Sequence, residues 1–157
     1  MINVLVYDDN KGRREGLELL INQSEDMRCI GTFENCSHVV EQVLEFKPDV
    51  VLMDIDMPEV NGIEGLKLIR KHAPNIMVIM QTVFEEEEKI FDAIRSGAHG
   101  YFLKKTPPLK LIDGIRDVRE GGAPMTASVA RKVLEVFQHQ PAKSVVKFDL
   151  TDRECQI

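Results

Sequence analysis

Apolar runs of strand length alternate with segments of helical periodicity along the first 120 residues, and this alternation restricts the fold more than any other feature. Repeated strand–helix units predict a parallel sheet with helices packed on both faces. We expect five strands, at about 2–7, 27–33, 49–54, 76–81 and 100–103. The helices that connect and follow them are expected at about 11–23, 37–46, 63–72, 85–96 and 108–120. The sequence therefore predicts a doubly wound α/β domain.

Four of the expected strands end beside a residue that is suited to handling a phosphoryl group. The first is followed by Asp8 and Asp9, the third ends at Asp54, the fourth stops just before Thr82, and the fifth is followed by Lys104. A switch point beside the first strand makes the first and third strands neighbours, and side chains at the carboxyl ends gather in one crevice. Three carboxylates so close repel one another unless they hold a cation. Because Mg2+ takes one or two carboxylates together with phosphate oxygens, the pattern predicts a phosphoryl-transfer site.

Each residue of this group has an expected role. An aspartate at the end of a buried strand is able to accept a phosphoryl group as an acyl phosphate, so Asp54 is the expected nucleophile. Such a carboxylate is more often a turn residue or a helix cap, and the neighbouring groups favour the functional interpretation. Asp9, with Asp8 directly or through a water molecule, is expected to hold the magnesium ion. Lys104 supplies a positive charge to the phosphoryl oxygens, and Thr82 donates a hydrogen bond to one of them.

Residues 1–120 resemble the receiver domain of two-component response regulators. The residues that carry the resemblance match in type, order and approximate spacing, and they are Asp8, Asp9, Asp54, Pro58, Gly62, Thr82, Tyr101 and Lys104. The resemblance implies a flavodoxin-like sheet of order 2-1-3-4-5. It also implies that Asp54 takes a phosphoryl group from a phosphohistidine on a sensor histidine kinase, with Mg2+ as cofactor. Tyr101 is then the switch aromatic that turns inward on phosphorylation, and the alternative for it is a half-exposed strand residue.

Two positions depart from the family pattern. Lys105 stands where proline often follows the family lysine, and the bond before that proline is often cis. Because a non-proline cis bond costs about 3–4 kcal/mol, the sequence leaves the isomer of the Lys104–Lys105 bond open. Asp56 adds a further acid beside the site. The loop at 57–62 is expected to fix the turn and to leave the backbone carbonyl of Asp56 free to bind the metal.

The last part of the sequence has a different character. We assign residues 121–148 to a linker that contains a short helix at about 127–138, with one apolar side formed by Val129, Ala130, Val133, Leu134 and Phe137. Residues 149–157 start like a new helix, because Thr-x-x-Glu forms a capping box. This tail resembles the linker and first turn of the helix-turn-helix domain of NarL/LuxR (FixJ) type regulators, truncated at its start. The resemblance implies DNA binding only through the missing C-terminal domain.

Charge and composition restrict the function further. The net charge is −6, and residues 121–157 contain five basic and four acidic side chains, so the first 120 residues carry −7. This acidic part is unsuited to direct nucleic-acid binding. The three cysteines have no paired spacing, and the sequence has neither a signal-peptide pattern nor an apolar stretch of about 20 residues. We therefore expect a cytoplasmic protein with no membrane partner.

Two other functions fit parts of the sequence. Residues 54–56 read Asp-Ile-Asp, which resembles the DxD signature of haloacid-dehalogenase-type phosphatases. That signature usually follows the first strand, and it would leave Asp8 and Asp9 unexplained. A phosphate-independent docking module is the second alternative, and the intact pocket argues against it. We expect that the chain is not an enzyme, and that it catalyses only its own phosphoryl transfer and autodephosphorylation. The sequence leaves open whether it forms a homodimer.

Overall fold

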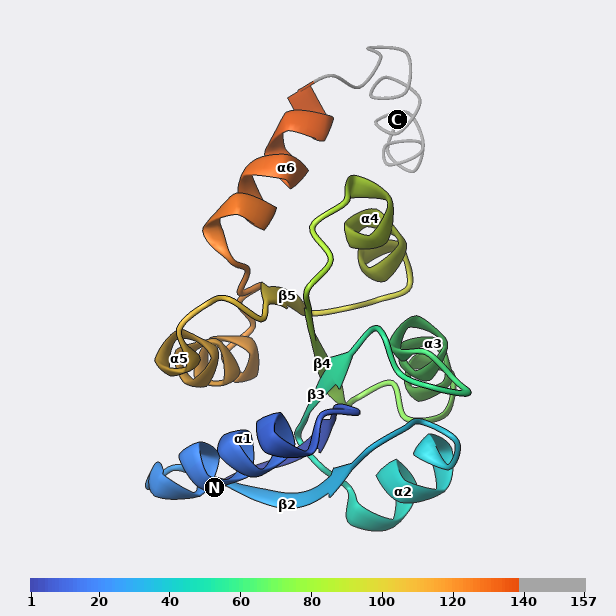
Figure 1. The fold of residues 1–157 in the computed structure, drawn as a ribbon, viewed down its shortest axis with the longest axis vertical. Helices are drawn as coiled ribbons and strands as arrows, with labels where there is room; N and C mark the ends of the chain where they lie inside the picture. The colour runs from blue at the N-terminus through green and yellow to red at the C-terminus, as the bar shows by residue number, and fades with distance from the viewer. Residues whose placement is uncertain (139–157) are drawn as a thin grey trace, which may run out of the picture.

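The computed structural model describes residues 1–138, which form a parallel sheet between two layers of helices, with one further helix at the end (Figure 1). The elements in chain order are β1 (Ile2–Tyr7), α1 (Lys11–Gln23), β2 (Met27–Phe33), α2 (Val39–Phe46), β3 (Val50–Asp54), α3 (Gly62–His72), β4 (Met77–Thr82), α4 (Glu87–Arg95), β5 (Gly100–Leu103), α5 (Pro108–Arg119) and α6 (Ala127–Gln138). The expected linker segment 139–148 and the expected start of a helix-turn-helix at 149–157 lie outside the described residues.

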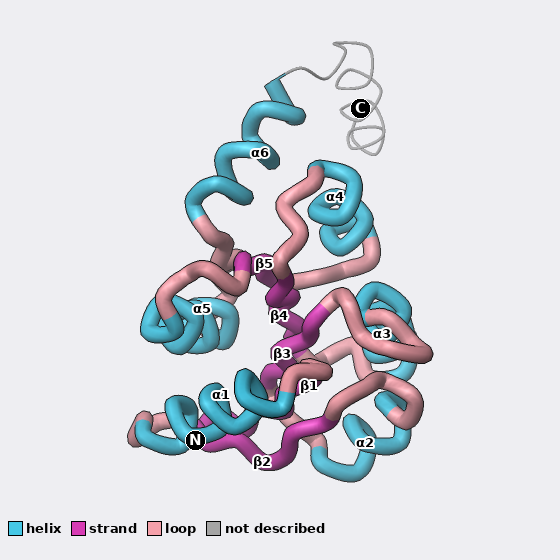
Figure 2. The backbone as a smooth tube through the Cα atoms, viewed as in Figure 1, coloured by secondary structure: helices cyan, strands magenta, loops and turns pink. Residues whose placement is uncertain are grey.

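The sheet has the order β2-β1-β3-β4-β5 and is parallel throughout, which confirms the expected fold. Helices α1 and α5 cover one face, and α2, α3 and α4 cover the other (Figure 2). Successive side chains of the buried strand β3 belong to the two hydrophobic cores on opposite faces of the sheet. Leu52 packs under α1 and α5, whereas Met53 packs under the other three helices. The strand order reverses beside β1, which is the position where sheets of this kind place their ligand sites, at the carboxyl ends of the strands.

The expected strands and helices are all found, with ends that shift by at most two residues. The helix expected from residue 85 begins at Glu87, and Glu86 is extended with φ −70° and ψ 139°. In the loop before it, the backbone carbonyl of Glu85 accepts a 2.8 Å hydrogen bond from Lys132 Nζ of α6. Glu85 and Glu86 therefore belong to the loop between β4 and α4.

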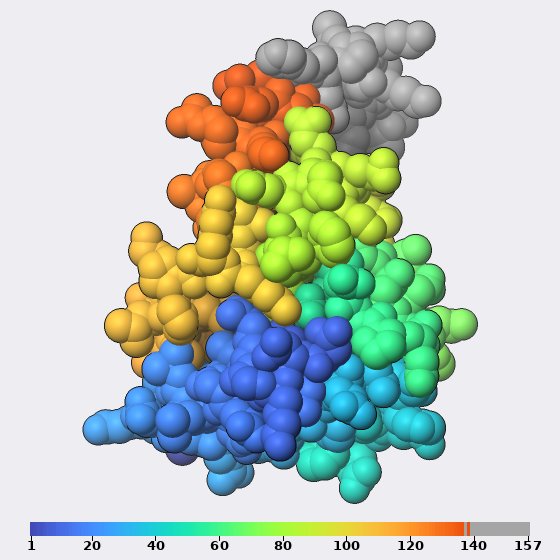
Figure 3. Space-filling view, in the orientation of Figure 1, coloured from blue at the N-terminus to red at the C-terminus, as the bar shows by residue number. Residues whose placement is uncertain are grey.

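Helix α6 packs against the edge strand β5 and against α4. In the space-filling view its atoms adjoin those of α4 (Figure 3). The segment before it pairs with β5, because Tyr101 N donates to the Pro124 carbonyl and Thr126 N donates to the Tyr101 carbonyl (3.0 and 3.1 Å). Val129 of α6 is fully buried, but Leu134 is 58% exposed. The apolar side expected for this helix is therefore covered only in part.

Two further observations concern the chain as described. Residues 1–138 contain no cis peptide bond, so the Lys104–Lys105 bond is trans. Within the same residues, every helix is too short or too polar to cross a lipid bilayer.

Candidate functional site at the carboxyl ends of the strands

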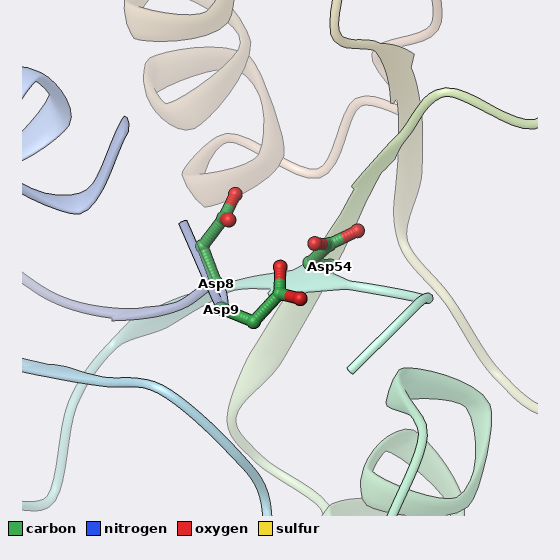
Figure 4. A group of neighbouring side chains, drawn as sticks. All are labelled: Asp8, Asp9 and Asp54. Carbon is green, nitrogen blue, oxygen red and sulfur yellow. The ribbon is translucent and has the colours of Figure 1, made fainter. Parts of the chain in front are cut away.

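Three aspartates from the ends of β1 and β3 lie together (Figure 4). Asp8, Asp9 and Asp54 each contribute a carboxylate oxygen, and these oxygens lie within 4.8 Å of one another. Asp8 is 0% exposed and Asp54 is 2% exposed, whereas Asp9 faces solvent. The two strands are hydrogen-bonded neighbours, so the expected juxtaposition follows from the sheet order.

Asp8 is held by the chain around it. Its Oδ1 accepts a 2.9 Å hydrogen bond from Asn10 N, and its backbone carbonyl accepts one of 2.9 Å from Arg14 Nη1. The buried Oδ2 atom accepts no hydrogen bond of regular geometry, although two cationic side chains lie near it. A buried carboxylate oxygen in this condition, next to two more carboxylates, is a donor set that fits a hard divalent cation.

Lys104 joins the acidic group from the end of β5. Its Nζ lies 2.9 Å from Asp54 Oδ2 and 3.0 Å from Asp8 Oδ2. Its backbone N donates to the Thr82 carbonyl (2.8 Å), which fixes the base of the side chain against β4. Burial lowers the pKa of Lys104, but the hydrogen bonds and charges of Asp54 and Asp8 together outweigh burial, and the net direction is upward. The lysine is therefore a firmly charged partner of both carboxylates.

Asp54 has an unusual protonation equilibrium. Burial raises the pKa of its carboxyl group to about 6, the hydrogen bond and charge of Lys104 oppose this shift, and the charge of Asp8 adds to it. The carboxylate is thus destabilised as an anion but still mostly ionised at neutral pH. This is the state that a nucleophilic carboxylate needs.

The loop after β3 approaches Asp54 very closely. Gly62 N donates to the Ile55 carbonyl (2.8 Å), and a Cβ atom on Gly62 would overlap the Asp54 backbone carbonyl. Asp56 N points back to Asp54 Oδ1 at 3.3 Å, while the Asp56 side chain is exposed. The metal-binding role of the Asp56 carbonyl stays a prediction.

Thr82 and Tyr101 contact the same residue from two sides. Thr82 is fully buried, and its hydroxyl accepts a 3.2 Å hydrogen bond from Phe84 N. Tyr101 is also fully buried, and its hydroxyl donates to the Phe84 carbonyl at 2.9 Å. The interpretation of Tyr101 as a half-exposed strand residue is wrong, because the ring lies inside under α4 and α6. The roles of both residues in switching stay predictions.

Sequence reasoning missed two residues of the pocket, Arg13 and Gln81. Arg13 Nη2 donates to Gln81 Oε1 at 2.8 Å, and its Nε lies 3.5 Å from Asp8 Oδ2. An arginine in the first turn of a helix looks like a solvated residue in a sequence. The only signal was Gln81 itself, a polar residue that ends the apolar run 76–80 and that the structure buries completely.

The fold and the site together define a doubly wound α/β domain with an acidic crevice at the switch point, and comparison with known proteins identifies its family. The sequence matches the response regulator receiver domain over residues 4–116. It is 39% identical to the transcriptional regulatory protein YxjL of Bacillus subtilis, over 99% of this chain and 73% of that protein. The chain belongs to the response regulator receiver domain family.

Solved structures agree with this assignment. The response regulator domain of CheB from Thermotoga maritima is 37% identical with a TM-score of 0.71, and the match covers 76% of this chain and 97% of that one. A DNA-binding response regulator of the LuxR family from Staphylococcus aureus is 28% identical with a TM-score of 0.72, covering 76% and 99%. The chain is thus similar to response regulators rather than to classical enzymes, and neither the phosphatase nor the docking-module alternative is favoured.

Proposed function

We propose that this receiver accepts a phosphoryl group on Asp54 from the phosphohistidine of a sensor histidine kinase and thereby controls a DNA-binding output domain. The observation that carries the proposal is the buried Asp54 carboxylate, which lies among two further aspartates with Lys104 Nζ at 2.9 Å. This arrangement supplies both a nucleophile and the positive charge that a transferred phosphoryl group requires.

The carboxylates of Asp8, Asp9 and Asp54 and the backbone carbonyl of Asp56 are the residues that would hold Mg2+. When bound, the ion neutralises phosphoryl oxygens that would otherwise meet three carboxylates in a partly buried site. The buried Oδ2 atom of Asp8, which accepts no hydrogen bond of regular geometry, supports this assignment. The remaining chemistry belongs to the chain's own side chains.

The transfer is a displacement at phosphorus. An Asp54 carboxylate oxygen forms a bond to phosphorus, the bond from phosphorus to the histidine nitrogen of the kinase breaks, and that nitrogen keeps the electron pair. Lys104 contacts Asp54 before the reaction and is placed to follow the charge onto the phosphoryl oxygens. The product is an acyl phosphate, and its hydrolysis by water is the autodephosphorylation that resets the domain.

The signal is proposed to leave the site through Phe84. A phosphoryl oxygen that attracts the Thr82 hydroxyl competes with the hydrogen bond from Phe84 N, and the Tyr101 hydroxyl is bound to the carbonyl of the same residue. The conformational change is then a population shift between two packings of the face formed by α4, β5 and α5. The hydrogen bonds that Thr82 and Tyr101 both make with the backbone of Phe84 support this route.

The output is proposed to be transcriptional. One relative is named a transcriptional regulatory protein, and one similar structure is titled a DNA-binding response regulator of the LuxR family. We propose a receiver at 1–120, a linker with a helix at 121–148 and the start of a helix-turn-helix domain at 149–157. The proposed partners are a sensor histidine kinase, DNA bound through that C-terminal domain, and a second copy of the chain. The proposed location is the cytoplasm.

Phosphorylation of Asp54 is directly testable. Acetyl phosphate and Mg2+ should add one phosphoryl mass to the chain, and Asp54→Asn should abolish the addition while Asp56→Asn retains it. Excess chelator or Asp9→Ala should suppress the labelling, because the carboxylates then repel the donor. Intact-mass spectrometry measures each case. Labelling of Asp54→Asn at the wild-type level would disprove the assignment, and labelling that is indifferent to chelator would disprove the role of the metal.

A further inference from the structure

Arg13 links α1 to the far side of the crevice. Its backbone N donates to Asn10 Oδ1 (2.8 Å), which fixes the first turn of the helix. Its side chain, 24% exposed, then crosses to Gln81 of β4, where Nη2 and Nε lie 2.8 and 3.3 Å from Oε1. The guanidinium group is therefore anchored on a fully buried acceptor and not spread on the surface.

Gln81 is placed to bring this cation to the acceptor. It is the register partner of Asp54 in the neighbouring strand, and register partners in a parallel sheet project from the same face. Its Nε2 atom has no hydrogen-bond partner. Burying an unpaired amide is costly, so an apolar residue would serve packing better at this position. The benefit that offsets this cost is the contact with Arg13.

If Arg13 only connected α1 to β4 through Gln81, its contact with Asp8 would have no explanation. Its Nε lies 3.5 Å from Asp8 Oδ2, the same oxygen that lies 3.0 Å from Lys104 Nζ. The charges of Asp8 and Asp54 both act to raise the pKa of Arg13 against the larger lowering effect of burial. The guanidinium group is thus part of the pocket's electrostatics.

The charges of the pocket give the consequence. Arg13 adds one positive charge beside Asp8 in every state of the pocket, whether it is metal-free, metal-bound or phosphorylated. This charge repels a divalent cation that binds the three carboxylates. It attracts a phosphoryl group, which adds one negative charge to Asp54. Arg13 therefore acts with opposite sign on the two ligands.

We propose that Arg13, anchored on Gln81, is a positioning residue of the pocket, a fixed second cation that weakens magnesium binding to the unphosphorylated site and favours the phosphorylated one. Its second effect rests on the proposed function of Asp54, whereas its effect on the metal does not. The opposite signs of the two effects distinguish this role from a structural one, because a damaged pocket would bind both ligands more weakly.

The first measurement is a calorimetric titration of the metal-free chain with MgCl2. Arg13→Gln should bind Mg2+ about three- to tenfold more tightly than the wild type, since one positive charge has left the vicinity of the ion. Lys11→Gln is the matched control, because it removes the same charge from the same helical turn at a position whose side chain is 78% exposed. The control should bind Mg2+ as the wild type does. Unchanged or weaker binding by Arg13→Gln would overturn the proposal.

The second measurement uses beryllofluoride, a phosphoryl analogue that also adds one negative charge to the Asp54 carboxylate. At saturating Mg2+, Arg13→Gln should bind it about three- to tenfold more weakly, as amide shifts in an NMR titration report. Arg13→Lys keeps the charge but loses the two-nitrogen contact with Gln81, so its affinities should lie between those of the wild type and of Arg13→Gln in both titrations. If Arg13→Lys behaves as Arg13→Gln does, or if Arg13→Gln binds the analogue as tightly as the wild type, charge compensation is refuted.

Failure of the proposed function gives a different result. Acetyl phosphate would then leave the wild-type chain unlabelled at Asp54, and the magnesium titration alone decides whether Arg13 acts as a second cation. The two hypotheses are therefore judged by separate observations.

Discussion

At the scale of single residues, the pocket is governed by the competition between burial and charge pairing. Asp54 is buried, which disfavours its ionised form, and Lys104 at 2.9 Å restores part of that lost stability. Asp8 adds repulsion from the other side. The Asp54 carboxylate is consequently an anion that gains from any further positive charge, and Lys104 is the residue that favours its ionised form.

Replacing Lys104 should therefore change the titration of Asp54. In metal-free Lys104→Met, the pKa of the Asp54 carboxyl should rise above its wild-type value of about 6, by about one unit or more, because the hydrogen bond and the charge that lower it are lost. The carboxyl 13C shift followed by NMR against pH measures this value. Lys105→Met is the matched control, since its side chain is 71% exposed and lies near Glu85 instead. A midpoint that is unchanged or lower in Lys104→Met would contradict the assignment.

At the scale of elements, the turn between β3 and α3 positions Asp54. Asn61 caps α3 by accepting a 3.0 Å hydrogen bond from Glu64 N, and Gly62 follows directly against the backbone of residues 54 and 55. The absence of a side chain at Gly62 lets the helix start this close to β3. The turn thus fixes the backbone on which the Asp54 carboxylate is mounted.

Gly62→Ala should destabilise the domain by about 2–4 kcal/mol, because the new Cβ would overlap the Asp54 carbonyl, which belongs to the backbone of a central strand. Gly16→Ala in α1 is the control, since its Cβ would meet nothing within 4 Å. That control should gain roughly 0.5–1 kcal/mol from improved helix propensity. Urea unfolding followed by circular dichroism compares the two. Equal stability of Gly62→Ala and the wild type would show that the turn tolerates a rearrangement.

The elements also show what a sequence reveals and what it does not. The alternating pattern predicts the five strands, and a switch point beside the first strand predicts the meeting of Asp8, Asp9 and Asp54, because these depend on local periodicity and on the geometry of parallel sheets. The full strand order is implied by the resemblance to receiver domains and not by the periodicity. The contact between the Glu85 carbonyl and Lys132, 47 positions away, is not predictable in this way. The pairing of Arg13 with Gln81 over 68 positions is likewise decided by tertiary packing.

At the scale of the whole molecule, burying the acidic site lowers the stability of the folded chain, and binding of a cation should restore it. The three aspartates lie at one end of the sheet, between two layers of helices. Burying the ionised carboxylate of Asp54 there is unfavourable and reduces the free energy of unfolding. An acid whose pKa is higher in the folded chain than in the unfolded chain binds protons more tightly when folded. Its contribution to stability therefore declines as pH rises through the interval between the two values.

For Asp54 this interval runs from 3.8 to about 6. Metal-free Asp54→Asn should be more stable than the wild type at pH 7.5, by up to about 3 kcal/mol, because the amide keeps an oxygen for Lys104 without the charge. The difference should vanish below about pH 4, where the wild-type carboxyl is protonated in both states. Mg2+ should stabilise the wild type more than the variant, since only the wild type offers all three carboxylates. Thermal unfolding at several pH values, with Mg2+ or chelator, tests these expectations. A variant that is less stable than the wild type at pH 7.5 in chelator would mean that Lys104 more than compensates for the burial of Asp54.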